Sequence, residues 1–105
     1  MYCLAILKDK RQGELKTDLL QHHVNYLKEL SSMGHLVMCG PYVNNDGAMM
    51  IFNCESLDHV RKLLANDPFI AEKYYQAYEI NEFLPANDEN NWLMDIPQTK
   101  GNLVE

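Results

Sequence analysis

The feature that most constrains the fold is the order in which two kinds of hydrophobic pattern follow one another along the chain. Short apolar runs rich in β-branched or aromatic residues predict strands, whereas apolar residues recurring every three to four positions predict amphipathic helices. Taken in order, these patterns give strand, helix, strand, strand, helix, strand. The expected strands are residues 2–8, 35–42, 48–54 and 74–84, and the helical patterns span residues 17–33 and 55–67.

This β-α-β-β-α-β order predicts a ferredoxin-like α+β fold, with a four-stranded antiparallel sheet and both helices on one face. The other face of such a sheet stays uncovered, and pairing it with a second copy is the usual way to bury its apolar residues. We therefore expect a homodimer joined through its sheets.

The chain of 105 residues fits one domain, which we place at residues 1–84. Residues 85–105 are polar, contain two prolines and lack periodicity, so they are expected to form a C-terminal tail. An apolar group, Trp92, Leu93, Met94 and Ile96, interrupts that tail. We expect this group to dock on the domain or on the partner subunit.

Composition excludes several classes of partner. The net charge of −6 argues against nucleic acid, which proteins bind through clustered Lys and Arg. No apolar run approaches the ~20 residues that span a membrane, and no secretory signal is visible. Cys3, Cys39 and Cys54 form no CxxC pair and lie in apolar segments, which indicates reduced core thiols and a cytoplasmic protein.

Local signals place the ends of the helices. Thr17 or Asp18 is expected to cap the first helix, and Gly34 lies where a left-handed residue would end it. Ser56 is the expected cap of the second helix. Pro68 must end that helix, because proline disfavours helical geometry at the residue before it.

Two adjacent histidines in the first helical segment differ in direction. Because each residue turns a helix by about 100°, His23 falls between Leu27 and Leu30 on the apolar face, whereas His22 faces water. His23 therefore has two possible roles. It is either a hydrogen-bonded core histidine, or an acid–base group above a cavity, where a carboxylate on its second nitrogen would set the tautomer.

Asp67 and the pair Gly40-Pro41 also have two readings each. Asp67 either bonds nearby amides where the helix ends, or is a carboxylate held at the rim of a pocket. Gly40 and Pro41 either have structural roles, Gly40 as a strand bulge and Pro41 as a residue typical of edge strands, or they form a place where a ligand approaches the backbone.

No metal site and no cofactor are expected. The histidines and cysteines show neither an i, i+4 pair on a helix nor CxxC spacing. Five scattered glycines make no phosphate-binding motif, and the chain contains no GxSxG nucleophile elbow.

Three segments, in this order, resemble the YCII-related (YciI-like) family: "HVNYLKEL" from His23, "GP" at Gly40-Pro41 and "DPF" from Asp67. The resemblance covers about residues 1–84. It implies a dimeric α/β-barrel with a small pocket on each subunit, and a catalytic pair that maps onto His23 and Asp67. Many members have an arginine three residues before the histidine, where this chain has Leu20.

Relatives in that superfamily carry out cofactor-free reactions on ring-derived molecules in aromatic catabolism, such as dehydrochlorination and lactone isomerisation. The resemblance therefore implies a lyase or isomerase in which His23 transfers a proton and Asp67 orients it. For such an enzyme we expect Gly40 and Pro41, where a ligand can approach the backbone, to contact a small-molecule substrate. The alternative is a non-catalytic small-molecule-binding or assembly module of the same fold, since one fold hosts many functions.

Overall fold

The computed structural model describes residues 1–104 and has the element order expected from the sequence. Its four main strands form a single antiparallel sheet in the order β2-β3-β1-β4, which confirms the ferredoxin-like α+β fold. The elements are β1 (Tyr2–Lys10), α1 (Thr17–Ser32), β2 (Leu36–Pro41), β3 (Ala48–Asn53), α2 (Leu57–Ala65), α3 (Pro68–Ala71) and β4 (Tyr75–Phe83).

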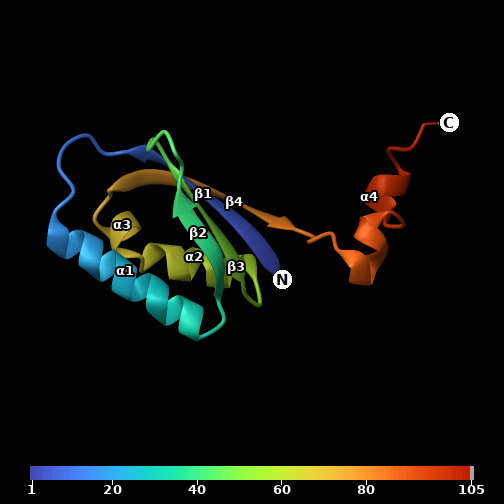
Figure 1. Cartoon of the computed structure of the whole chain (residues 1–105), viewed down its shortest axis with the longest axis horizontal. Coiled ribbons are helices and arrows are strands. Elements are labelled where there is room, and N and C mark those ends of the chain that lie inside the picture. Colours follow the sequence, from blue (N-terminus) through green and yellow to red (C-terminus); the bar gives the residue numbers. More distant parts are fainter. Residues whose placement is uncertain (105) are drawn as a thin grey trace.

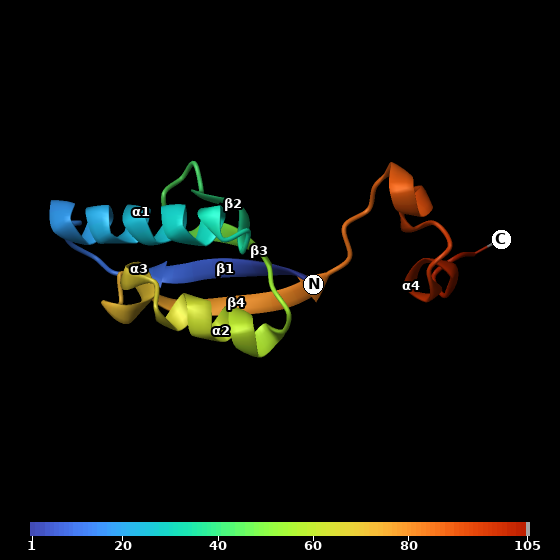
Figure 2. The same ribbon diagram turned by 90° about the horizontal axis from the view of Figure 1, so that it is seen from below.

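Both long helices lie on the same face of the sheet (Figures 1 and 2). Side chains alternate between the two faces of a strand, and in β1 Cys3, Ala5 and Leu7 are at most 1% exposed because they point toward the helices. Their register partners in β3 include Met50 and Phe52, which are also buried. The core fills the space between this face and the apolar sides of the helices. The helices contribute Leu30, Val60, Leu64 and Phe69.

The opposite face of the sheet carries apolar residues that remain partly exposed. Leu4 pairs with Ile51 and Ile6 pairs with Met49, so these four side chains share that face. Met38 lies opposite Ile51 on the edge strand β2 and is 61% exposed. Within residues 1–104 no helix covers this surface, since α1 and α2 lie on the other side of the sheet (Figure 1). A surface suited to the expected sheet-to-sheet dimer is therefore present, while the dimer itself stays a prediction.

The helix ends agree with the sequence signals except at the start of α1. The N-cap there is Lys16, whose side chain makes no capping hydrogen bond, so the prediction of Thr17 or Asp18 was wrong. Thr17 is already the first residue of the helix, so the N-cap position falls on the residue before it, Lys16. Gly34 has the expected positive φ of 79°, and Ser56 caps α2 by accepting a hydrogen bond from the backbone N–H of His59.

The C-terminal tail extends beyond β4, away from the sheet and helices of its own chain (Figure 1). It contains a short 3-10 segment (Asp88–Leu93) and α4 (Pro97–Lys100). Trp92 and Met94 are 63% and 64% exposed, so the tail does not bury them on its own domain. Docking on a partner subunit stays a prediction. None of the helices within residues 1–104 combines the length and apolar character needed to cross a membrane.

Candidate active site

His23 and Asp67 meet although they lie far apart in the sequence. The imidazole Nδ1 of His23, in the second turn of α1, is 2.7 Å from Oδ1 of Asp67. The His23 side chain is 12% exposed, whereas His22 next to it is exposed. The direction assigned to each histidine from the helix repeat is therefore the direction observed.

Asp67 is held in place by the turn that it begins. It is the N-cap of α3, with Pro68 at the first helical position, and its φ and ψ of −67° and 123° are the extended geometry that a following proline favours. Its Oδ1 also accepts a hydrogen bond of 2.9 Å from the backbone N–H of Phe69. The carboxylate thus caps the helix that follows it, and it orients His23 with the same oxygen.

The Asp67 side chain is buried, at 1% exposed, and its second oxygen Oδ2 has no hydrogen-bond partner among residues 1–104. A buried carboxylate with few partners gains most from a cationic neighbour. The side chain in hydrogen-bond contact with this carboxylate is His23.

The tautomer of His23 follows from the chemistry of its partner. An ionised Asp67 carboxylate would only accept hydrogen bonds, so it would select the neutral His23 tautomer with the proton on Nδ1 and the lone pair on Nε2. The ring of Phe69 stacks on the imidazole, with centroids 3.6 Å apart and planes 6° from parallel. The hydrogen bond and the stack together fix both the position and the plane of the imidazole.

A pocket of about 370 Å³ opens beside His23, between α1, the β2–β3 hairpin and α3. Gly40 and Pro41 line it, as does Leu20, so the pocket brings together the sequence-predicted site residues, with Asp67 directly behind His23. Apart from a few polar groups its wall is apolar. The lining residues are Leu7, Leu15, Leu20, His23, Val24, Leu27, Cys39, Gly40, Pro41, Asn45, Ala48, Met49, Met50, Phe69, Tyr74 and Tyr75.

The structure excludes the predicted bulge at Gly40, whereas it confirms the predicted position of Pro41 on an edge strand. The bulge of β2 lies between Leu36 and Met38 and not at Gly40, and a Cβ added at Gly40 would meet nothing within 4 Å. Pro41 is the last residue of β2, which is an edge strand, as the sequence reading of this proline expected. Packing within the chain therefore does not require Gly40, and its contact with a substrate stays a prediction.

Two other titratable groups that line the pocket, Cys39 and Tyr75, have pKa values raised above their ordinary values and keep their protons at neutral pH. Burial, followed by the charge of Asp67, raises the pKa of the Cys39 thiol. Burial also raises the pKa of Tyr75, with Tyr74 and Asp67 adding to the effect. These groups can donate hydrogen bonds but are poor bases.

Three polar residues of the pocket were not identified from the sequence. Tyr74 and Tyr75 were read only as strand formers, and Asn45 only as a turn residue. Asn45 has the left-handed φ of 63° that its turn demands, and its carbonyl accepts a hydrogen bond of 2.9 Å from Lys10 Nζ. No pattern in the sequence marks these three residues as pocket residues, because tyrosine is common in strands and asparagine is common in turns whether or not a pocket is present.

Comparison with known proteins identifies a family and structural similarity to solved structures. Residues 1–84 match the YCII-related domain. No curated protein matches the sequence. Among solved structures, the chain resembles 5-chloro-2-hydroxyhydroquinone dehydrochlorinase (TftG) from Burkholderia phenoliruptrix AC1100, in complex with 2,5-dihydroxybenzoquinone. The two are 24% identical with a TM-score of 0.69, and the match covers 87% of this chain and 100% of that one. At this identity the likeness shows the fold.

Proposed function

The chain belongs to the YCII-related domain family, and on that premise we propose that it is an enzyme that transfers protons on a small, ring-derived organic molecule. The observation that carries the proposal is the 2.7 Å hydrogen bond between His23 Nδ1 and buried Asp67, beside a pocket lined by His23. This arrangement presents an oriented imidazole to a small molecule, which is what general acid–base catalysis requires.

In the proposed reaction Nε2 of His23 removes a proton from an enolisable carbon or a ring hydroxyl of the substrate. The bond to hydrogen breaks, the proton joins Nε2, and Asp67 stabilises the resulting imidazolium. In an elimination, the electron pair forms a double bond and expels a leaving group such as chloride. In an isomerisation, the Nε2 proton is returned to a different carbon of the substrate.

The pocket favours a small, single-ring substrate. Its volume of about 370 Å³ lies at the lower end of the ~300–1,000 Å³ typical of small-molecule sites, and its wall is mostly apolar. The structurally similar TftG is named as a dehydrochlorinase of a chlorinated hydroxyhydroquinone. Positioned acid–base catalysis contributes about 10²–10⁴-fold, which suits elimination or isomerisation of an already acidic carbon without a cofactor.

We also propose that two copies pair through the uncovered face of the sheet. Leu4, Ile6, Met49 and Ile51 lie together on that face and remain partly exposed in the single chain. Exposed apolar patches of this kind mark association surfaces. Sedimentation should give twice the mass of the chain, and Ile6→Lys should give the monomer.

The test of the function uses 5-chloro-2-hydroxyhydroquinone as substrate and measures chloride release. We expect the wild type to release chloride and His23→Ala to lose at least about 100-fold in kcat/KM. His22→Ala, which removes the exposed neighbouring imidazole, is the matched control and should retain full activity. Release by His23→Ala at the wild-type rate would refute the assignment.

Binding of 2,5-dihydroxybenzoquinone separates the enzyme from the non-catalytic module of the same fold. Asp67 both caps α3 and holds His23, so the non-catalytic alternative gives this pair a purely structural role. The pocket would then bind a ligand without catalysing a reaction. Saturable binding with no chloride release by the wild type, and no other proton-transfer reaction on related hydroquinones or lactones, would support the module.

A further inference from the structure

A second group of chemically active side chains lies away from the pocket. The ligating atoms of His35, Cys54 and His59 all lie within 4.8 Å of one another. His35 follows the turn that ends α1, Cys54 follows the last residue of β3, and His59 lies in the first turn of α2. The fold therefore brings together three potential ligands from three separate segments.

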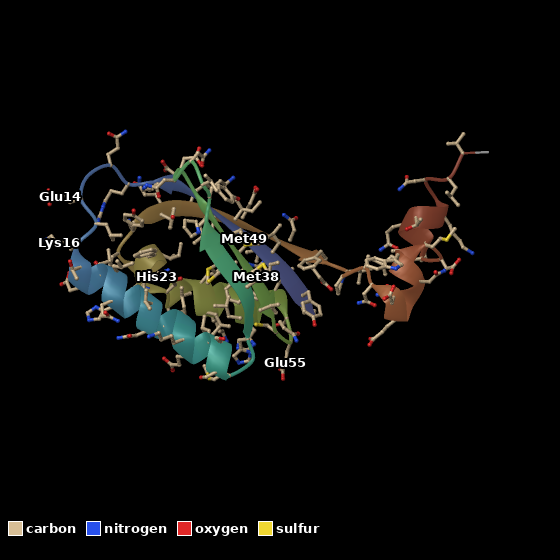
Figure 3. All side chains as sticks on the ribbon, in the orientation of Figure 1. Glu14, Lys16, His23, Met38, Met49 and Glu55 are labelled. Carbon is tan, nitrogen blue, oxygen red and sulfur yellow. The ribbon has the colours of Figure 1, made fainter. Side chains whose placement is uncertain are left out.

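The cluster lies at the opposite end of the domain from the pocket. His23, in the second turn of α1, precedes the end of that helix at Ser32 by nine residues, or roughly 14 Å. Figure 3 labels His23 toward one end of the domain and Glu55, the residue after Cys54, toward the other. A ligand at this cluster would not contact the proposed catalytic pair.

Backbone hydrogen bonds fix two of the three segments relative to one another. The N–H of Asn53 donates to the carbonyl of His35 at 2.9 Å. The N–H of Cys54 donates to the carbonyl of Met1 at 3.0 Å, and the terminal ammonium of Met1 donates to the carbonyl of Cys54 at 2.7 Å. The backbone positions of His35 and Cys54 are therefore set by the end of the sheet, and Nδ1 of His35 also lies 3.5 Å from the carbonyl oxygen of Asn53.

We propose that His35, Cys54 and His59 form a zinc site. Two imidazoles and one thiolate are a ligand set that Zn²⁺ accepts, with a water in the fourth tetrahedral position. Zn–N distances of about 2.0–2.1 Å and a Zn–S distance of about 2.3 Å place tetrahedral ligand atoms roughly 3.3–3.7 Å apart. The present spread of up to 4.8 Å would close by about 1 Å through side-chain rotation.

The burial of the three residues fits this arrangement. Cys54 is 5% exposed, whereas His35 and His59 are half-buried, so the thiol forms the inner wall and solvent reaches the histidine side. The rings of His35 and His59 meet edge to face at 4.8 Å, an arrangement that aromatic packing alone would also produce. On binding, the Cys54 S–H bond breaks, a Zn–S bond forms, and the proton passes to solvent.

The absence of a metal site was expected from the sequence because no ligand pair has helical or CxxC spacing. That reasoning considered distance along the chain. The antiparallel pairing of β2 with β3 brings His35, just before β2, close to Cys54, just after β3. Rules based on spacing along the sequence do not detect such a pair.

The test is a titration of the chelator-stripped full chain with ZnCl₂, followed by calorimetry, with CoCl₂ as a spectroscopic probe. We expect one Zn²⁺ per chain, and a thiolate-to-cobalt charge-transfer band with the visible bands of tetrahedral Co²⁺. Cys54→Ser should abolish the charge-transfer band, and both Cys54→Ser and His59→Ala should weaken Zn²⁺ binding by about 100-fold or more.

His22→Ala is the matched control, since His22 is an exposed histidine outside the cluster, and it should bind Zn²⁺ like the wild type. His59 lies near the surface on α2, so His59→Ala should fold even if substitution of buried Cys54 does not. Circular dichroism checks both. Failure of the wild type to bind Zn²⁺, or unchanged binding by folded His59→Ala, would overturn the proposal.

Zinc should also stabilise the fold, because it would link the end of α1, the end of β3 and the start of α2. At a free Zn²⁺ concentration 100 times Kd, the ratio of folded to unfolded chain should rise about 100-fold. The Tm of the wild type should rise by about 10 °C and that of His59→Ala should not. An equal rise in both proteins would contradict a site that includes His59.

Discussion

Asp67→Asn tests whether the charge of the buried carboxylate, and not only its shape, is needed. The substitution keeps the size of the side chain and an oxygen that can accept from the Phe69 N–H, so α3 keeps its cap. It removes the negative charge 2.7 Å from His23 Nδ1. The imidazole then loses the partner that stabilises it when it gains a proton.

The magnitude follows from the geometry and the burial of the pair. Two unit charges with centres ~4 Å apart interact by about 4 kcal/mol at an effective dielectric constant of ~20, a value suited to protein sites. Because about 1.4 kcal/mol corresponds to a tenfold change in rate, the loss predicts a fall in kcat of roughly 10³-fold. The value of KM should change little, because Asp67 lies behind His23 and is only 1% exposed.

Stability should change much less than activity. The new amide NH₂ would occupy the place of Oδ2, which has no partner among residues 1–104, and an unpaired buried donor costs about 1–3 kcal/mol. Removal of a buried charge offsets this cost. We therefore expect a net change of about 1 kcal/mol or less, a Tm shift of at most about 8 °C.

The assay is chloride release from 5-chloro-2-hydroxyhydroquinone, with circular dichroism to check folding. Asp58→Asn is the matched control, since Asp58 forms an exposed ion pair with Arg61 at 2.7 Å, and exposed pairs contribute little. It should leave both kcat and Tm near the wild-type values. A folded Asp67→Asn protein whose kcat stays within tenfold of the wild type would refute the reasoning.

The remaining predictions concern three other residues of the domain, Tyr26, Cys39 and Gly40. Tyr26 donates a 2.7 Å hydrogen bond to the Leu63 carbonyl, so Tyr26→Phe should lower the free energy of unfolding by about 1 kcal/mol, measured by urea titration; an unchanged midpoint would contradict it. Burial, followed by the charges of Asp67 and Glu29, raises the pKa of Tyr26 from 10.0 to about 12. The unfolded chain therefore loses this proton first, and the stability that Tyr26 provides, complete below pH ~10, should be lost as pH rises through ~12 in the wild type but not in Tyr26→Phe. The pKa of Cys39 is raised, so iodoacetamide should modify this thiol slowly at neutral pH and faster as the pH rises. Mass spectrometry measures the modification, and fast modification at neutral pH would contradict the prediction. The variant Cys39→Ser should keep chloride release. Gly40→Ala places a Cβ in open space and should leave Tm within a few degrees, whereas a large drop would show a packing role that the structure does not contain.

The sequence predicted the fold because its local signals agree with one another. The switch between strand and helix patterns determined the order of elements, and the glycine and proline positions marked most of their ends. The start of α1 was missed because no side chain caps it, so the only local signal was the helical pattern itself. The tail was expected to bury Trp92 on the domain or on a partner, and in the single chain Trp92 stays exposed.

The candidate site was partly predictable for a similar reason. Helix geometry alone determined that His23 faces inward, because α1 is regular over its length. No local rule brings Asp67 to His23, since that contact depends on how α3 packs against α1. The same limit explains why Tyr74 and Tyr75 were not assigned to the pocket. Contacts between elements follow from the assembled fold and not from spacing along the chain.

The most direct test of the central claim is to determine which nitrogen of His23 carries the proton. Long-range ¹H–¹⁵N correlation NMR of the imidazole-labelled chain, at a pH where the ring is neutral, reports this for each histidine. Assignment uses His23→Ala, and His22 provides an exposed reference ring in the same spectrum. We predict protonated Nδ1 and unprotonated Nε2 in His23 of the wild type, and loss of this preference in Asp67→Ala. A His23 ring protonated at Nε2 would contradict the account, because it would leave no base facing the pocket.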